Sequence, residues 1–126
     1  MAAIGAGADL VYVASPQKSA EAIKSTSPDL IVKSLDGDKL SLNHSQEILE
    51  LADNVDAVLI GPGAGIDEET SKLFNVLVAK IKKPIVLDAD ALKQVELKLI
   101  ESRDDIILTP HIFEFKSFFN VADEHD

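Results

Sequence analysis

The sequence predicts an α/β fold built on a doubly wound, mainly parallel sheet with helices on both faces. Two observations lead to this prediction. Short runs rich in valine, isoleucine and leucine alternate with longer amphipathic segments along the chain, as strands buried on both faces alternate with crossover helices. The connections are short, which implies right-handed crossovers. Such sheets bind ligands beyond the carboxyl ends of their strands, so the residues directly after each strand are the first candidates for a site.

The predicted elements follow from local patterns. Five compact apolar runs are predicted strands: residues 9–14, 29–33, 56–60, 84–87 and 106–108. Four amphipathic segments between them are predicted helices: residues 16–25, 45–52, 67–82 and 90–102. The clearest is 67–82, whose apolar residues recur at helical spacing. Pro16 is expected at the first position of its helix. The Asp36-Gly37 pair predicts a small hairpin over residues 35–40.

Composition limits the classes of function. The chain of 126 residues has the length of one domain, and 46% hydrophobic content suffices for one core. With 22 acidic and 12 basic side chains the net charge is -10, which repels nucleic acids and anionic lipids, so neither is an expected partner. The absence of cysteine excludes disulfides and thiolate zinc sites and fits a cytoplasmic protein. Neither a signal peptide nor a membrane-length apolar run is recognisable.

A glycine-rich segment after the third predicted strand is the strongest local feature. Gly61, Gly63 and Gly65 alternate with Pro62 and Ala64 and lead into a predicted helix. Glycines let backbone amides approach a ligand closely, and a helix N-terminus favours an anion. The segment matches neither the dinucleotide fingerprint nor the P-loop. It could equally be a plain tight turn, and the acids at 67–69 would repel a phosphate. A sugar-like group and a phosphate are therefore both possible ligands.

Two aspartates follow the fourth predicted strand. Asp88 and Asp90 could hold a hydrated metal ion or the hydroxyls of a sugar. Asp90 could instead be the N-cap of the following helix. Asp88 ends an apolar strand, so its carboxylate needs a partner.

The fifth predicted strand is followed by Thr109, Pro110 and His111, with Glu114 one turn further on. Thr109 and Pro110 read as the N-cap and first residue of a helix, which places His111 in its first turn and facing the crevice. A histidine there suits a neutral hydrogen-bonding role. Four phenylalanines at helical spacing are expected to form a simple core face: Phe113, Phe115, Phe118 and Phe119.

Other candidate sites lack support. His44 and His125 have no histidine partners at zinc-ligand spacing. The loop 36–38 fails the calcium pattern because Leu40 occupies the third ligand position. Ser15 and Ser71 lack the glycines of a nucleophile elbow, so covalent hydrolysis is not predicted.

Taken in order, residues 61–65, the run from Pro84 to Leu92, and Leu108 to His111 with Glu114 and Phe115 resemble one known family. The chain is similar to the ADP- or ATP-dependent NAD(P)H-hydrate dehydratases of the ribokinase-like superfamily. Residues 5–11 resemble that family's approach to its first strand, and residues 27–32 its second strand. The resemblance covers nearly the whole chain.

The resemblance implies repair of hydrated NADH or NADPH. In this reaction water is eliminated from the damaged nicotinamide ring after nucleotide-driven phosphorylation of its hydroxyl, with ATP or ADP and Mg²⁺ as cofactors. By this analogy Gly63 and His111 contact the hydrated cofactor. Asp88, Asp90 and Glu114 line the same crevice or help to place magnesium.

The sequence also departs from the family. Members are longer, and their Gly-x-Gly-Asp segment, which carries the catalytic aspartate, does not occur in this chain. Much of the family's adenine-nucleotide site lies in the same C-terminal half, and the family's glycine- and alanine-rich helix ahead of the first strand is expected to be missing from this chain too. The chain is therefore expected to be part of a dehydratase, to bind nucleotide weakly or not at all and to be inactive alone.

Two other hypotheses remain. A ribokinase-like kinase for a small vitamin precursor or sugar would share the sheet and the glycine turn. The other alternative is a non-catalytic module that associates with itself or a partner, because a sheet cut midway exposes an edge and apolar surface. A homo-oligomer is expected on the same grounds.

Overall fold

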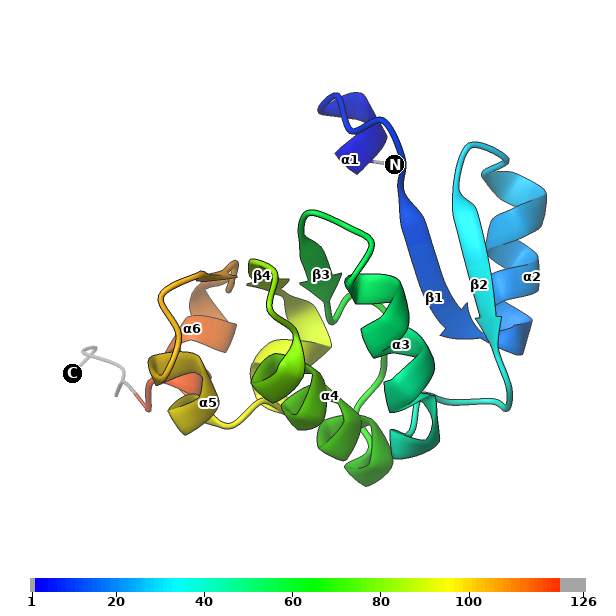
Figure 1. The fold of residues 1–126 in the computed structure, drawn as a ribbon. Helices are drawn as coiled ribbons and strands as arrows, with labels where there is room; N and C mark the ends of the chain where they lie inside the picture. Colours follow the sequence, from blue (N-terminus) through cyan, green and yellow to red (C-terminus); the bar gives the residue numbers. More distant parts are fainter. Residues whose placement is uncertain (1, 121–126) are drawn as a thin grey trace. The chain divides into compact units, whose positions relative to one another are not determined.

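The computed structural model describes residues 2–120, and His125 lies outside them. The chain divides into two compact units, Met1–Leu40 and Ser41–Asp126, whose elements are labelled in Figure 1. We describe each unit by itself. The single domain over residues 1–126 that the length suggests stays a prediction.

The first unit is a parallel strand pair packed on one helix. It comprises α1 (Ala2–Gly5), β1 (Tyr12–Pro16), α2 (Gln17–Thr26) and β2 (Ile31–Leu35). The two strands pair in parallel, and Ala20 of α2 and Leu35 of β2 are fully buried. The short helix α1 lies before the first predicted strand, where the sequence predicted no element.

Both strands of this unit lie two residues or more beyond their predicted positions. The backbone of residues 6–8 is still hydrogen-bonded to α1, for example from Ala8 N to the Ala3 carbonyl at 3.0 Å. The chain therefore cannot pair as a strand from residue 9. Pro16 ends β1 and occupies the N-cap of α2 rather than its first helical position. The predicted hairpin over residues 35–40 is wrong, because residues 36–39 form a bend.

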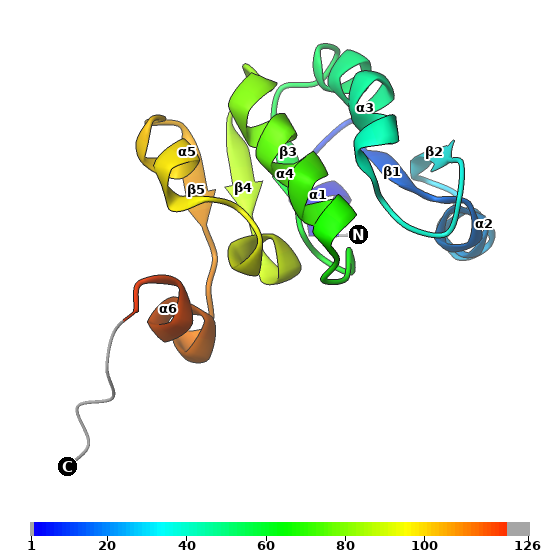
Figure 2. The same ribbon diagram turned by 90° about the horizontal axis from the view of Figure 1, so that it is seen from below.

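The second unit holds the larger sheet. Its elements are η1 (Leu42–His44), α3 (Ser45–Ala52), β3 (Val58–Ile60), α4 (Glu68–Lys80), β4 (Ile85–Leu87), η2 (Ala89–Lys93), α5 (Leu97–Glu101), β5 (Ile106–Leu108) and α6 (Ile112–Phe118). The strands pair in parallel in the order β3-β4-β5. Helix α4 covers one face of this sheet (Figure 2) and buries Leu73, Phe74, Leu77 and Val78. The predicted parallel-sheet α/β class is confirmed.

The other face of this sheet is exposed. Leu59, Val86 and Ile107 form one row in register across the three strands. The exposed fractions are 61% for Leu59 and 62% for Ile107. Burial of β3 and β5 on both faces was therefore wrongly predicted, because successive side chains of a strand point to opposite faces and only the face that carries residues such as Ile60 is buried. We call these three residues the exposed row.

The predicted helix over residues 90–102 is wrong. The chain forms the 3₁₀ helix η2, breaks at residues 94–96 and resumes as α5. The break has a polar cause. The Glu96 amide donates to Asn75 Oδ1 at 2.8 Å and the Gln94 carbonyl accepts from Ser71 Oγ at 3.0 Å, so these backbone groups bond to side chains of α4 instead of continuing the helix.

The phenylalanines of α6 do not form the predicted core face. The exposed fractions are 75% for Phe113, 42% for Phe115 and 43% for Phe119. Among the described elements this helix packs mainly on η2, which is too short to cover all its apolar positions. No helix among residues 2–120 is long and apolar enough to cross a membrane.

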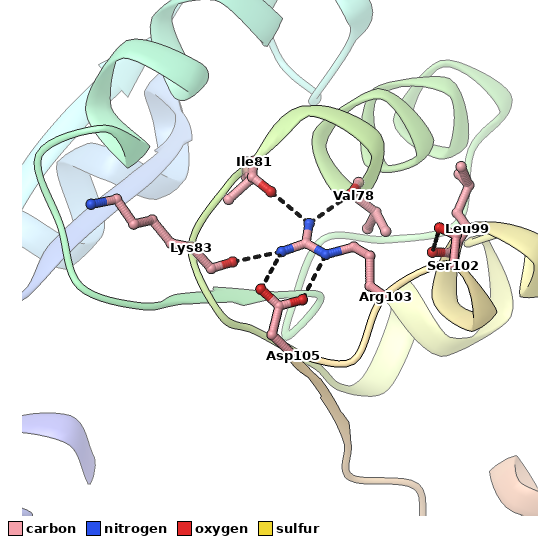
Figure 3. A network of polar contacts seen from close by, with 7 residues as sticks. All are labelled: Val78, Ile81, Lys83, Leu99, Ser102, Arg103 and Asp105. Carbon is pink, nitrogen blue, oxygen red and sulfur yellow. Dashed lines mark hydrogen bonds and ion pairs between the residues drawn. The ribbon is translucent and has the colours of Figure 1, made fainter.

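One polar cluster, which sequence reasoning missed, ties the C-terminal end of α4 to the next two strands (Figure 3). The guanidinium of Arg103 donates to the carbonyl oxygens of Val78 at 2.8 Å, Ile81 at 2.6 Å and Lys83 at 2.9 Å. It also forms a bidentate pair with Asp105, at 2.8 Å for each bond. This pair raises the pKa of Arg103 and lowers that of Asp105.

Candidate functional site

The candidate site lies at the edge where the three parallel strands of the second unit end. Ile60, Leu87 and Leu108 stand in register as the last residues of their strands. The Asp88 amide donates to the Ile60 carbonyl and the Thr109 amide to the Leu87 carbonyl, each at 3.1 Å. The three segments predicted from the sequence therefore leave the sheet side by side, as expected.

The glycines after β3 form a tight turn, which we call the glycine turn (residues 61–65). All three have positive φ, at 128° for Gly61, 72° for Gly63 and 79° for Gly65. A Cβ atom at Gly61 would overlap the carbonyl oxygen of Asp88. At Gly63 and Gly65 a Cβ atom would meet nothing within 4 Å. Gly61 is thus required by close packing, whereas Gly63 leaves an open backbone that a ligand can approach.

Helix α4 begins directly beyond this turn. Asp67 is its N-cap, and Asp67 Oδ1 accepts from the Glu69 amide at 2.9 Å. Capping by a carboxylate satisfies a helix donor and complements the helix dipole. Asp67 therefore has a structural role at the start of α4.

The glycine turn is held by Gln94, a residue that sequence reasoning missed. Gln94 Nε2 donates to the Gly65 carbonyl at 2.8 Å and to the Asp90 carbonyl at 2.9 Å. Gln94 Oε1 accepts from the Asp67 amide at 3.2 Å. Gln94 lies 29 positions from Gly65 in the sequence, so no local pattern signals the contact.

The two aspartates after β4 each accept a hydrogen bond from a backbone amide. Asp88, not Asp90, is the N-cap, with Asp88 Oδ1 accepting from the Ala89 amide at 2.8 Å. Asp90 Oδ2 instead accepts from the Gly65 amide at 2.9 Å. The N-cap falls on Asp88 because η2 begins at Ala89. Asp90 thereby joins the glycine turn to the segment after β4.

His111 caps α6, so the prediction of Thr109 as N-cap and Pro110 as first helical residue is wrong. The Thr109 backbone is still hydrogen-bonded to β4, and the helix cannot begin there. His111 Nδ1 accepts from the Glu114 amide at 3.2 Å, and Glu114 Oε2 accepts from the His111 amide at 3.0 Å. His111 Nε2 lies 3.3 Å from Glu114 Oε1. The imidazole is 62% exposed, whereas the Glu114 side chain is 10% exposed.

These contacts bring the predicted residues together in two groups. Gly61, Gly65, Asp88 and Asp90 form one group with Gln94. His111 and Glu114 form the other. Gly63 stands at the open side of the first group. A cavity of about 290 Å³ lies between η2, α5 and α6, lined by Glu114 and by Leu92, Lys93, Val95, Leu97, Ser117 and Phe118.

The described residues do not fit a protein-built magnesium site. Magnesium takes near-octahedral oxygen coordination, often from one or two carboxylates with substrate phosphates. Among residues 2–120, no three histidine, aspartate or glutamate side chains converge on one point. The carboxylates of Asp88, Asp90 and Glu114 each accept hydrogen bonds from backbone amides. Their predicted share in placing magnesium stays a prediction.

Comparison with known proteins identifies the family. A family model described as NAD(P)H-hydrate dehydratase matches residues 1–126. The chain belongs to this family. The resemblance inferred from the strand-end motifs is confirmed.

Named relatives agree with this assignment. A bifunctional NAD(P)H-hydrate repair enzyme from Methanothermobacter thermautotrophicus is 45% identical over 95% of this chain, which covers 24% of that protein. An ATP-dependent (S)-NAD(P)H-hydrate dehydratase from Entamoeba histolytica is 36% identical over 96% of the chain, which covers 41% of it. The chain thus spans less than half the length of either relative.

Solved structures support the fold. A ribokinase-like superfamily protein from Enterococcus faecalis matches 96% of the chain with a TM-score of 0.73 and 19% identity, and the chain covers 42% of it. A protein from Streptococcus mutans matches the same share with a TM-score of 0.72 and 25% identity. Both likenesses support the α/β fold of this chain.

Proposed function

We propose that this chain supplies the part of an NAD(P)H-hydrate dehydratase that holds the hydrated nicotinamide cofactor. The observation that carries the proposal is that β3, β4 and β5 end in register at one edge of the sheet. The glycine turn, Asp88 and the segment that leads to His111 therefore leave the sheet beside one another. A ligand lying across the carboxyl ends of parallel strands meets all three segments. Membership of the family supplies the substrate class.

Within this edge we propose different roles for the seven candidate residues. Gly63 and His111 make the direct contacts, because the backbone of Gly63 is open and the His111 ring is exposed. The remaining five already use their polar atoms or their close packing within the protein, and they shape the edge: Gly61, Gly65, Asp88, Asp90 and Glu114.

The cofactor proposal follows the relatives. The Entamoeba histolytica protein is named as ATP-dependent, and we propose ATP as the phosphoryl donor of the whole dehydratase, with Mg²⁺ as its partner. We assign neither group to residues of this chain. A cytoplasmic location likewise stays a prediction.

Calorimetry with hydrated NADH and the 126-residue chain tests the binding role. We expect binding by the wild-type chain and about tenfold weaker binding by His111→Asn, which keeps a helix-capping side chain but lacks the ring. Thiazole and pyrimidine alcohols serve as competing probes. A chain that binds these alcohols but does not bind hydrated NADH would favour the kinase alternative and contradict our proposal.

An absorbance assay tests the catalytic side. We expect no ATP-dependent loss of hydrated NADH with the chain alone, because the sequence contains no Gly-x-Gly-Asp segment. Steady turnover by the purified chain would contradict this expectation.

We also propose that two copies of the chain associate through the exposed row. Parallel sheets are almost always covered on both faces, and the row carries no charge although the chain has a net charge of -10. Light scattering should show a dimer for the wild-type chain and a monomer for Leu59→Lys. The control Leu42→Lys, which lies away from the row, should remain a dimer. A wild-type monomer at every concentration would rule out this association.

A further inference from the structure

We propose that Gln94 is a positioning residue that holds the glycine turn in the shape required for the hydrated cofactor. The inference rests on the proposed function, in which the open side of this turn contacts the ligand. Gln94 is 8% exposed and lies just beyond η2, behind the turn. It would act on the ligand only through the backbone that it holds.

The hydrogen bonds of Gln94 use its whole amide. Both donor hydrogens are engaged, on the carbonyl oxygens of Gly65 and Asp90, and the oxygen accepts from the Asp67 amide. A carboxylate of the same length could not donate, and an ammonium could not accept. Asparagine is one carbon shorter and would not span the same three groups. Of the residues compared, only glutamine therefore supplies the two donors and the acceptor at the length that this position requires.

Both polar groups of Gly65 are tied to the segment after β4. Its carbonyl accepts from Gln94 Nε2, and its amide donates to Asp90 Oδ2 at 2.9 Å. Gln94 also reaches the amide of Asp67, the N-cap of α4. One side chain thus connects the end of the turn with the start of the helix.

The opposite side of the turn stays open. A Cβ atom at Gly63 would meet nothing within 4 Å. Inside the turn the Ala64 amide donates to the Gly61 carbonyl at 3.1 Å. A backbone that is fixed from behind and open in front presents its groups to a ligand without a further ordering cost. Loss of Gln94 should therefore weaken binding.

Gln94 is itself held by α4. Its backbone carbonyl accepts from Ser71 Oγ at 3.0 Å and from Asn75 Nδ2 at 3.1 Å. These bonds do not involve the side-chain amide. Ser71→Ala therefore provides a matched control, because it removes a contact of the same residue and leaves the three side-chain bonds in place.

The test uses Gln94→Met, a substitution of similar shape without hydrogen-bonding groups, in the 126-residue chain. Calorimetry with hydrated NADH should show about tenfold weaker binding, the loss expected for one or two net hydrogen bonds. Ser71→Ala should bind within about twofold of wild type. A folded Gln94→Met chain that binds hydrated NADH as tightly as wild type would overturn the proposal.

Amide hydrogen exchange separates this proposal from the proposed function. We expect the Gly65 and Asp67 amides to exchange at least about tenfold faster in Gln94→Met, while amides in β4 stay protected. If wild type does not bind hydrated NADH, the proposed function fails. The positioning role is then judged on exchange alone, and unchanged Gly65 and Asp67 rates would refute it.

A second variant covers the case in which Gln94→Met does not fold. Gln94→Glu keeps an acceptor for the Asp67 amide but has no donor for Gly65 and Asp90. The Asp67 amide should stay protected while binding of hydrated NADH falls several-fold. Wild-type affinity in this variant would likewise count against the proposal.

Discussion

The two ends of helix α4 are held by similar devices with different consequences. At the N-terminal end the uncharged amide of Gln94 bonds to the backbone of Gly65, Asp90 and Asp67. At the C-terminal end the charged guanidinium of Arg103 bonds to three carbonyls and to Asp105. In each case one long side chain from a later segment bonds to backbone groups at or near one end of the helix.

The difference lies in what each device leaves open. Arg103 points inward between α4 and the starts of β4 and β5 (Figure 3), and its partners are all backbone carbonyls or the carboxylate of Asp105. Gln94 supports a turn whose far side is uncovered at Gly63. We infer that the C-terminal end contributes stability, whereas the N-terminal end contributes shape for a ligand.

The largest expected effect is that of Gly61→Ala, at the start of the glycine turn. The added Cβ would overlap the Asp88 carbonyl and force a side chain into a φ of 128°. We expect a loss of at least about 3 kcal/mol in the free energy of unfolding, measured by urea denaturation. Gly63→Ala is the control and should cost about 1 kcal/mol, because its φ of 72° is unfavourable but its surroundings are open. Equal costs would show that close packing at Gly61 is unimportant.

Arg103→Met tests the opposite end. The substitution leaves Asp105 unpaired and three carbonyls without their donor, so we expect a loss of about 2 to 3 kcal/mol in the free energy of unfolding. Binding of hydrated NADH by the folded chain should not change. Lys98→Met, at an exposed position of α5, serves as control and should have little effect. Weaker binding of hydrated NADH by folded Arg103→Met would contradict the inference that the C-terminal end of α4 contributes stability alone.

A smaller effect is expected for Asp67→Ala, which removes the side-chain cap of α4. The loss should be about 1 kcal/mol in the free energy of unfolding, measured by thermal or urea denaturation. Asp67→Asn keeps a capping oxygen and should restore most of the loss. If the alanine and asparagine variants are equally stable, the hydrogen bond from the Glu69 amide to the Asp67 side chain does not contribute to the free energy of unfolding.

Acid pH should weaken the C-terminal end through Asp105. Its bond to Arg103 lowers the pKa of the carboxyl in the folded chain. The stabilisation is therefore complete above the unfolded pKa, about 3.9, and is lost as the pH falls toward the lower folded value. The difference in stability between wild type and Asp105→Asn should accordingly shrink below about pH 4. A constant difference over the acid range would argue against the pair.

Patterns that repeat locally were predicted well from the sequence. The structure places α3 at Ser45–Ala52, as predicted, and β5 at Ile106–Leu108. The strand-end segments are also where they were expected, since parallel strands in register end at one edge. Three motifs in order were enough to indicate the family.

Contacts between distant segments were not predictable. Arg103 bonds to the Val78 carbonyl 25 positions earlier, and no periodicity or motif marks such a pair. The cap at His111 was missed for another reason. Thr109 and Pro110 form a familiar helix start, but the sheet holds Thr109 to β4, and this tertiary bond outweighs the local preference. The exposed row was missed because strand composition does not reveal which face is covered.

The close approach at Gly61 has a consequence for the genetic variation that the position can accept. Every nonsynonymous single-base change of a glycine codon introduces a side chain or ends translation, so only third-base variation should be neutral there. Asparagine tolerates the left-handed region, and at the open positions of Gly63 and Gly65 it should pass a selection for folding. A saturation library sorted for folded chains should therefore retain only glycine at position 61, while several other residues should remain at positions 63 and 65.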